Sequence, residues 1–252
     1  MKLENKSVVV TGASAGMGKV IVETFVKEGA SVVAVARRQP LLDELAASLK
    51  DAPGKIVTMV GDVGKRADNE AMIDLAVKEF GRLDILVNNA GIMDDMSAIG
   101  DMSDDLLEKV MQVNMFGPMY AMRKAVQVFL EQDDGGNIIN IVSVGAFRNI
   151  AGVAYSASKA AMVSATKNTA FMYLDNEIRC NAIAPGAIMT DISSAMPKSN
   201  EFGKSRTLTI LKLNPDIGMP KDIASTAVFL ASDESRFING VVLEVDGGWS
   251  NL

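Results

Sequence analysis

Tyr155 and Lys159 lie four residues apart, a spacing that places two side chains on the same face of a helix. A free tyrosine has a pKa of about 10, which is too high for efficient proton exchange at neutral pH. A neighbouring ammonium group favours the tyrosinate and lowers that pKa. The pair is therefore a candidate for acid–base chemistry on a substrate oxygen, although a Tyr-x-x-x-Lys pair alone is more often a surface pair.

The sequence contains no histidine and only one cysteine, Cys180. Ser-His-Asp and Cys-His catalysis are thereby excluded, and we expect no metal site because histidine ligands are missing. Gly12 to Gly16 match the Gly-x-Ser-x-Gly turn that carries the nucleophile of many hydrolases. Ser14 has no histidine to activate it, so acid–base chemistry is left to Tyr, Lys, Asp or Glu.

Gly12, Gly16 and Gly18 lie between a predicted strand and a predicted helix. Glycines at such a junction permit a tight turn and let backbone N–H groups approach a pyrophosphate at the helix N-terminus. The alternative is a purely structural turn. The segment predicts a dinucleotide site if it forms part of a βαβ unit.

Arg37 and Arg38 follow the second predicted strand, where sites for NAD place an Asp or Glu against the ribose 2′-hydroxyl. Two guanidinium groups suit a 2′-phosphate instead, because they form charge-assisted hydrogen bonds with it. The alternative is a solvated basic start to the next helix. We therefore predict that the cofactor is NADP(H), with at least about a tenfold preference over NAD(H).

These residues need a framework of alternating strands and helices. Short, largely unbroken apolar runs predict strands at 7–11, 31–36, 55–60, 84–88, 137–143, 179–184 and 241–245. Helical spacing occupies 16–28, 40–50, 65–80, 103–131, 153–174 and 220–231. The alternation predicts an α/β fold, a Rossmann-type doubly wound parallel sheet of about seven strands with helices on both faces. We expect residues 1–252 to form a single domain.

Composition narrows the class of protein. The net charge is −6 and no basic tract is present, which argues against a nucleic-acid partner. The sequence has neither an apolar run long enough to cross a membrane nor an apolar stretch near Met1, so we expect no membrane span and no signal peptide. A lone cysteine indicates a reducing compartment, and we expect a cytoplasmic protein.

Several motifs occur in an order that resembles the short-chain dehydrogenase/reductase family, in its short single-domain branch. They are Thr11 to Gly18, Asn88 to Gly91, Ser143, Tyr155 to Lys159, Pro185-Gly186 and Asp246 to Gly248. The resemblance covers essentially the whole chain. It implies a catalytic tetrad of Asn114, Ser143, Tyr155 and Lys159, in which Tyr155 exchanges a proton with the substrate oxygen. Ser143 would hydrogen-bond that oxygen, and the Asn114 position would hold a water linked to Lys159. A satisfied core amide is the less favoured alternative for Asn114.

The resemblance also implies a set of cofactor-binding residues along the glycine turn, the strand ends and the catalytic helix. They are Gly12, Ser14, Gly16, Met17, Gly18, Arg37, Arg38, Asp62, Val63, Asn89, Ala90, Gly91, Tyr155, Lys159, Pro185, Gly186, Ile188 and Thr190. Many NADP-linked members carry a basic residue where this chain has Ala15. The NADP(H) prediction therefore depends on Arg37 and Arg38.

The substrate is the least constrained part of the prediction. Apolar candidates in the loops after the strands are Met93, Val144, Phe147, Met189 and Met196, and residues 187–215 are long enough for a lid with its own helix. Flexible thioethers suit a bulky apolar ligand, although methionines also fill gaps in cores. We predict a secondary alcohol or ketone of the hydroxysteroid or bile acid type.

A 3-oxoacyl thioester or a sugar or polyol is the alternative substrate within the family. A non-catalytic NADP(H)-binding sensor is the alternative of another class, which the presence of all four tetrad residues disfavours. From the resemblance we expect a homo-oligomer, a tetramer or a dimer.

Overall fold

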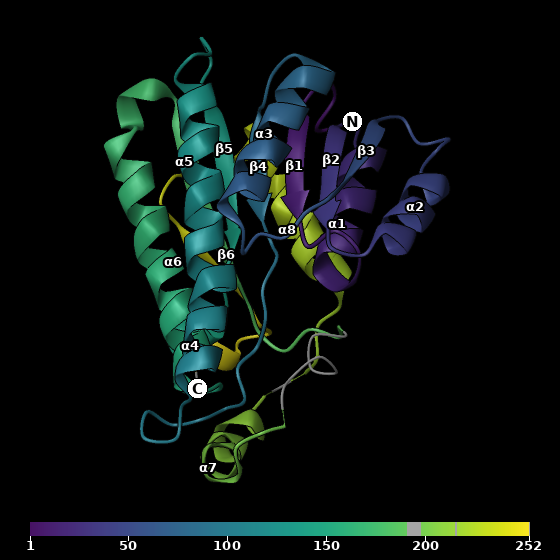
Figure 1. Cartoon of the computed structure of the whole chain (residues 1–252). Helices are drawn as coiled ribbons and strands as arrows, with labels where there is room; N and C mark the ends of the chain where they lie inside the picture. Colours follow the sequence, from purple (N-terminus) through teal and green to yellow (C-terminus); the bar gives the residue numbers. More distant parts are fainter. Residues whose placement is uncertain (191–197, 215, 252) are drawn as a thin grey trace.

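A single sheet of seven parallel strands runs through the centre of the protein in the order β3-β2-β1-β4-β5-β6-β7 (Figure 1). The computed structural model describes residues 1–190, 198–214 and 216–251. The strands are β1 (Ser7–Thr11), β2 (Ser31–Ala36), β3 (Lys55–Val60), β4 (Ile85–Asn88), β5 (Gly136–Ile141), β6 (Ile178–Pro185) and β7 (Val242–Val245). The predicted doubly wound parallel sheet is confirmed.

Helices cover both faces of the sheet (Figure 1). One layer consists of α1 (Gly16–Lys27), α2 (Gln39–Ser48) and α8 (Pro220–Ala231). The other consists of α3 (Arg66–Phe80), α5 (Gly117–Phe129) and α6 (Val153–Met172), beside which α4 (Asp104–Met111) lies. A short helix, α7 (Glu201–Leu211), stands apart from the two layers beyond the carboxyl ends of the strands. It lies within the segment where the sequence predicted a lid with its own helix.

The unbroken apolar strands follow from this double cover. In β1, Val8 and Val10 pack into the core beneath α1 and α8, whereas Val9 packs into the core beneath α3 and α5. Successive side chains of a strand point to opposite faces, so a strand buried on both faces needs apolar residues at every position. The strand order reverses between β1 and β4, and such a reversal opens a crevice at the carboxyl ends of the strands.

The helix predicted at 103–131 is the main local difference. A π-helical turn, Gln112–Phe116, separates α4 from α5 within one continuous helical path. Such turns are rare and occur often at functional sites. This one contains Asn114.

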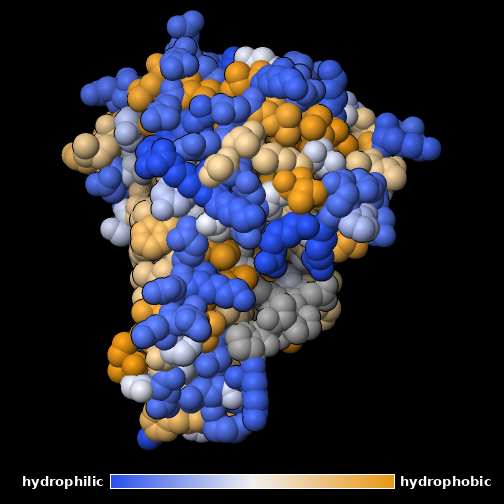
Figure 2. Space-filling model, viewed as in Figure 1, coloured by the Kyte–Doolittle hydropathy of each residue, from blue (hydrophilic) through white to orange (hydrophobic). Residues whose placement is uncertain are grey.

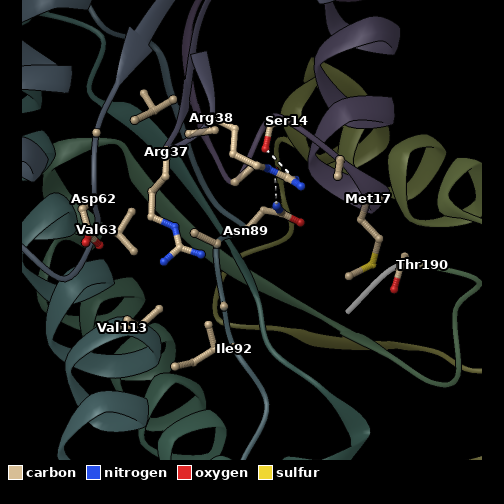
Figure 3. Close-up of a pocket in the computed structure, with 18 of the residues that line it drawn as sticks. Ser14, Met17, Arg37, Arg38, Asp62, Val63, Asn89, Ile92, Val113 and Thr190 are labelled. Atoms are coloured by element: carbon tan, nitrogen blue, oxygen red, sulfur yellow. Dashed lines mark hydrogen bonds between the residues drawn. The ribbon is translucent and has the colours of Figure 1, made fainter. Parts of the chain in front are cut away.

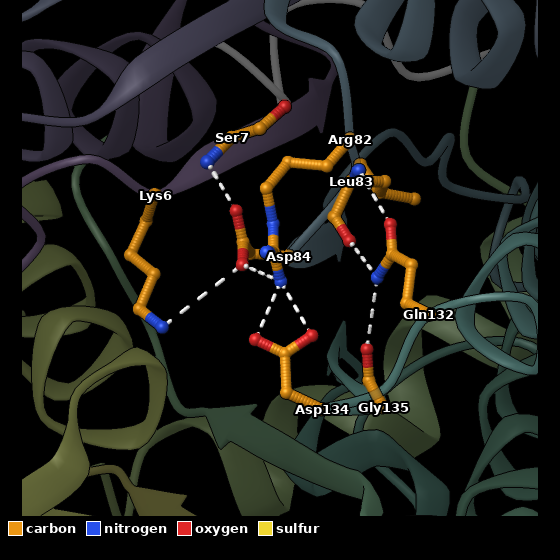
Figure 4. Close-up of polar contacts among 8 residues, drawn as sticks. All are labelled: Lys6, Ser7, Arg82, Leu83, Asp84, Gln132, Asp134 and Gly135. Atoms are coloured by element: carbon orange, nitrogen blue, oxygen red, sulfur yellow. Dashed lines mark hydrogen bonds and ion pairs between the residues drawn. The ribbon is translucent and has the colours of Figure 1, made fainter.

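At the amino ends of the strands, opposite the crevice, a polar network joins Ser7 at the start of β1 to Asp84, which immediately precedes β4 (Figure 4). The buried carboxylate of Asp84 accepts a hydrogen bond of 2.7 Å from the Ser7 amide and pairs with Arg82 at 2.9 Å. Arg82 also binds both carboxylate oxygens of Asp134, at 2.6 and 2.7 Å. The network holds together the amino ends of β1 and β4, whereas the crevice lies at their carboxyl ends.

On the face seen in Figure 2, hydrophilic and hydrophobic residues are intermingled. None of the helices in the described ranges has the length and apolar character needed to cross a membrane.

Candidate active site

The glycine turn after β1 has the backbone shape that only glycine adopts easily. Gly12 and Gly16 have φ angles of +70° and +53°, in the left-handed region that other residues avoid. α1 begins at Gly16, and its N-cap, Ala15, has no side chain that could cap the helix. The N–H groups of this first turn are therefore available to an anion such as a pyrophosphate.

Gly18 packs closely against the glycine turn. A Cβ at this position would overlap the carbonyl oxygen of Gly12 and the side chain of Asn89, and Gly18 is buried. It is not among the described residues that line the cleft beside it. Gly18 lets α1 approach the end of β1 closely, and its contact with the cofactor stays a prediction.

A cleft of about 370 Å³ opens over the glycine turn (Figure 3). Most of the predicted cofactor-binding residues line it, and Met93, predicted for the substrate, lies there too. They are Gly12, Ser14, Gly16, Met17, Arg37, Arg38, Asp62, Val63, Asn89, Ala90, Gly91 and Thr190. The structure adds Lys109 and Val113 from the helical segment after β4. No sequence motif marks these two residues, and only the fold brings them to the cleft.

Arg37 and Arg38 reach into the cleft from the end of β2 (Figure 3). Arg38 Nη2 donates a hydrogen bond of 3.0 Å to the Ser14 hydroxyl, which ties the arginine pair to the glycine turn. Lys109 adds a third cation to the cleft wall, and Asp62 contributes the one carboxylate among the described residues that line it. The Asp62 carboxylate accepts from the Gly64 amide at 2.9 Å. The cleft thus has the positive character that a phosphorylated ligand requires.

The loop after β4 is fastened to the end of β1. The Thr11 hydroxyl accepts hydrogen bonds from the amides of Asn89 and Ala90, at 3.0 and 3.1 Å. Asn89 Nδ2 donates to the Thr11 carbonyl at 2.9 Å. These bonds hold the cleft wall at the point where the strand order reverses.

Tyr155, Lys159 and Ser143 lie together beyond one end of this cleft, and all three are buried. A Cβ on Gly145 would meet Ser143 Oγ at 3.2 Å and Tyr155 Cε1 at 3.5 Å, so the two side chains flank the same glycine. Lys159 Nζ donates a hydrogen bond of 2.9 Å to the Ile141 carbonyl. The structure therefore brings the predicted Tyr-Lys pair and Ser143 to one place.

Burial is the main cause of the pKa shifts of Tyr155 and Lys159. It raises the pKa of the Tyr155 phenol above its usual value, while a hydrogen bond with Ser143 acts in the opposite direction and the charge of Asp94 adds to the rise. Burial lowers the pKa of Lys159 to about 8. Burial is thus the main influence on the Tyr155 pKa in the chain alone, and the expected lowering of this pKa by Lys159 stays a prediction.

Asn114 connects the catalytic group to the cleft. A Cβ on Gly91, which lines the cleft, would meet Asn114 Oδ1 and Lys159 Nζ at 3.4 Å each. The Asn114 amide accepts from the Ile92 N–H at 2.8 Å, donates to the Ile92 carbonyl at 2.9 Å and donates to the Ser158 hydroxyl at 3.2 Å. Its side chain joins the loop after β4 to α6, and the water-holding role stays a prediction.

Pro185, Gly186 and Ile188 are not among the described residues that line the cleft. Gly186 packs against Asp246, whose Cβ would lie 2.7 Å from a Cβ on the glycine. Ile188 forms an isolated bridge with Gly218. These residues shape the loop after β6, and among the described residues of that segment Thr190 alone lines the cleft.

The predicted substrate residues separate in the structure. Phe147 and Met189 are exposed, and Met196 lies outside the described residues. Val144 lines a small cavity of about 30 Å³ with Arg148, Ile150, Ile210, Leu213, Trp249 and Ser250. The sequence did not indicate the contribution of α7 and the chain end to this cavity, because neither carries a motif.

No group of three or more His, Cys, Asp or Glu side chains that could hold a metal ion occurs in 1–190, 198–214 or 216–251.

Comparisons with known proteins agree with this architecture. A family model described as enoyl-(acyl carrier protein) reductase matches residues 12–250. The chain is 45% identical to 3beta-hydroxysteroid dehydrogenase 2 of Eggerthella lenta over 249 residues, which are 98% of this chain and 96% of that protein. It is 35% identical to the 3-oxoacyl-(acyl-carrier-protein) reductase of Thermotoga maritima, over 98% of this chain and 99% of that one. The crystal structure of levodione reductase superposes with a TM-score of 0.90 at 31% identity, covering 99% of both chains.

Proposed function

Since the chain belongs to the short-chain dehydrogenase/reductase family, as an oxidoreductase similar to hydroxysteroid dehydrogenases, we propose that it interconverts a secondary alcohol and a ketone with NADP(H). Tyr155 is the acid–base group in this proposal. The chain acts as one domain, residues 1–252. The observation that carries the proposal is the position of the buried Tyr155, Lys159 and Ser143 next to Gly91, at the end of a cation-lined cleft.

The cleft residues fit NADP(H). The free N–H groups at the start of α1 suit the pyrophosphate, and Arg37 and Arg38 suit the 2′-phosphate. Lys109 adds positive charge to the same cleft. When bound, NADPH supplies the hydride for the carbonyl carbon.

The chain's own residues handle the oxygen of the substrate. Ser143 donates a hydrogen bond to that oxygen as negative charge develops on it, and Tyr155 delivers the proton. Lys159, held by the Ile141 carbonyl, keeps a cation beside the phenol. Burial of the three side chains excludes water and strengthens these interactions.

We propose a bulky apolar substrate of the hydroxysteroid or bile acid type. The similarity to 3beta-hydroxysteroid dehydrogenase 2 supports this class. The similarity to a 3-oxoacyl-(acyl-carrier-protein) reductase makes a 3-oxoacyl thioester the second candidate.

NADPH oxidation with a panel of hydroxysteroid ketones, a 3-oxoacyl thioester and a keto sugar tests the proposal. We expect turnover of a steroid ketone and a kcat/KM for NADPH at least about tenfold above that for NADH. Turnover confined to sugars would contradict the substrate class. NADPH binding without turnover of any ketone would indicate a sensor instead.

We further propose a cytoplasmic homo-oligomer, a tetramer or a dimer. Exposed apolar side chains on the long helices, among them Phe116 on the π-helical turn and Phe171 and Met172 on α6, support association between copies. Sedimentation velocity at micromolar concentration checks this, and a monomer would contradict it.

A further inference from the structure

Asp94, in the loop after β4, is a fully buried carboxylate. It is bonded to main-chain N–H groups of two different segments. Asp94 Oδ2 accepts from the Tyr155 amide at 2.8 Å. Asp94 Oδ1 accepts from the Gly152 amide at 3.1 Å and from the Met96 amide at 3.0 Å. A buried carboxylate is costly unless such donors surround it, so its presence beside Tyr155 calls for a reason.

The carboxylate caps the helix that carries the proposed catalytic pair. The N-cap of α6 is Gly152, which has no side chain to cap the helix itself. Asp94 supplies that cap from another element, and the Ser97 carbonyl accepts from the Val153 amide at 3.1 Å. Three N–H groups at the start of α6 are thus bonded to residues 94–97, which fixes the position and direction of the turn that carries Tyr155.

The fit between Asp94 and Gly152 is close. A Cβ on Gly152 would lie 2.6 Å from Asp94 Cγ and Oδ1, nearer than real Cβ contacts come. Gly152 has a φ of −71°, which any residue adopts. A glycine is therefore required here by the approach of the carboxylate and not by the backbone angle.

The same loop also contacts the start of α7. The Asn200 amide, at the N-cap of α7, donates to the Asp95 carbonyl at 2.7 Å. A Cβ on Gly203 would overlap the Met96 carbonyl oxygen. Residues 94–97 consequently hold the start of α6 on one side and α7, which lines the small cavity beside Val144, on the other.

We propose that Asp94 is a positioning residue for the reaction: its carboxylate aligns Tyr155 through the first turn of α6 and places a fixed negative charge near the phenol. This inference rests on the proposed role of Tyr155. Three groups act on that phenol: Asp94 from the loop after β4, Ser143 from the end of β5 and Lys159 from α6. The negative charge of Asp94 disfavours the tyrosinate and raises the Tyr155 pKa.

A spectroscopic titration tests this inference without requiring turnover. The chain has three tyrosines, so the tyrosinate absorbance of Tyr155 is obtained by subtracting the titration of Tyr155→Phe from that of the wild type. The same subtraction is then made between the Asp94→Asn variant and the Asp94→Asn, Tyr155→Phe double variant. We expect Asp94→Asn to lower the Tyr155 midpoint by about half a pH unit or more, because a negative charge is removed. Asp105→Asn, which removes an exposed carboxylate at the start of α4, should leave the midpoint unchanged. An unchanged midpoint in Asp94→Asn would overturn the inference.

Gly152→Ala tests the alignment while keeping the charge. The added methyl group displaces the carboxylate from the start of α6, so we expect kcat to fall at least about tenfold. The dissociation constant for NADPH, measured by fluorescence, should stay within about twofold of the wild type because the cleft is untouched. A wild-type kcat in Gly152→Ala would overturn the inference, and so would equal losses in kcat and NADPH binding, which indicate general unfolding. If the wild type turned over no ketone, the proposed function would fail while the Asp94→Asn titration still decided the inference.

Discussion

Lys159 Nζ lies over the face of the Tyr155 ring, 5.7 Å from its centroid. The same nitrogen is held by the Ile141 carbonyl, and both side chains are buried. A cation over an aromatic face is attracted by the electrons of the ring, yet burial lowers the Lys159 pKa to about 8. The free protein thus holds a lysine charge that its surroundings disfavour.

The free-energy cost of burying the Lys159 charge predicts how the free energy of unfolding depends on pH. Below pH 8 Lys159 is charged in both states and the folded state carries the full cost. Between the folded pKa of about 8 and the ordinary value of 10.5, the unfolded chain binds more protons, so stability rises with pH. At about 1.4 kcal/mol per pH unit, this contribution is on the order of 3 kcal/mol.

Lys159→Met should abolish the contribution while preserving side-chain length. We expect the wild type to gain stability relative to Lys159→Met as the pH increases from 7.5 to 10. Urea unfolding of the two proteins at several pH values measures this, and their difference cancels the titrating groups that are distant from Lys159. Parallel stability curves for the two proteins would show that the charge of Lys159 is not disfavoured.

Arg37 and Arg38 should determine the choice of cofactor. Replacing both with Ala should raise the KM for NADPH about tenfold or more and leave the KM for NADH nearly unchanged, because only NADPH carries a 2′-phosphate. Ser14→Ala keeps both charges and removes only the 3.0 Å bond from Arg38, so its effect should be smaller. Arg66→Ala, whose arginine pairs with Glu70 on the exposed side of α3, serves as the control. Equal losses with both cofactors would contradict the role of the pair.

Asp84 should contribute to stability and not to turnover. Asp84→Asn weakens the buried contacts with Ser7 and Arg82 (Figure 4), and we expect a loss of about 2 kcal/mol in the free energy of unfolding. The network lies at the amino ends of the strands, so kcat should stay within about twofold of the wild type. Asp51→Asn, at an exposed carboxylate, should change neither quantity. A large loss of kcat in folded Asp84→Asn would show that the network at the amino ends of the strands is coupled to the catalytic residues.

The fold was largely predictable because its signals are local. A strand covered on both faces must be apolar at each position, and the prediction placed every strand within two residues at either end. The π-helical turn around Asn114 escaped prediction, since a turn with one extra residue leaves the apolar spacing of a long helix almost unchanged.

The site was predictable where a motif carries the chemistry and not where the fold alone supplies it. Tyr155, Lys159 and Ser143 meet as their motifs implied. Lys109 reaches the cleft, and Asp94 reaches the start of α6, through tertiary contacts that no spacing reveals. The sequence also does not quantify burial, which raises the pKa of Tyr155 in the chain alone.

The central claim, that Tyr155 delivers the proton, is tested most directly by the turnover of Tyr155→Phe. This substitution removes only the phenolic hydroxyl, so NADPH should bind within about twofold of its wild-type affinity. The kcat for a steroid ketone should fall at least about a thousandfold, since general acid catalysis typically contributes 10²–10⁴-fold. Retention of more than about a tenth of the wild-type kcat, with NADPH binding intact, would contradict the claim.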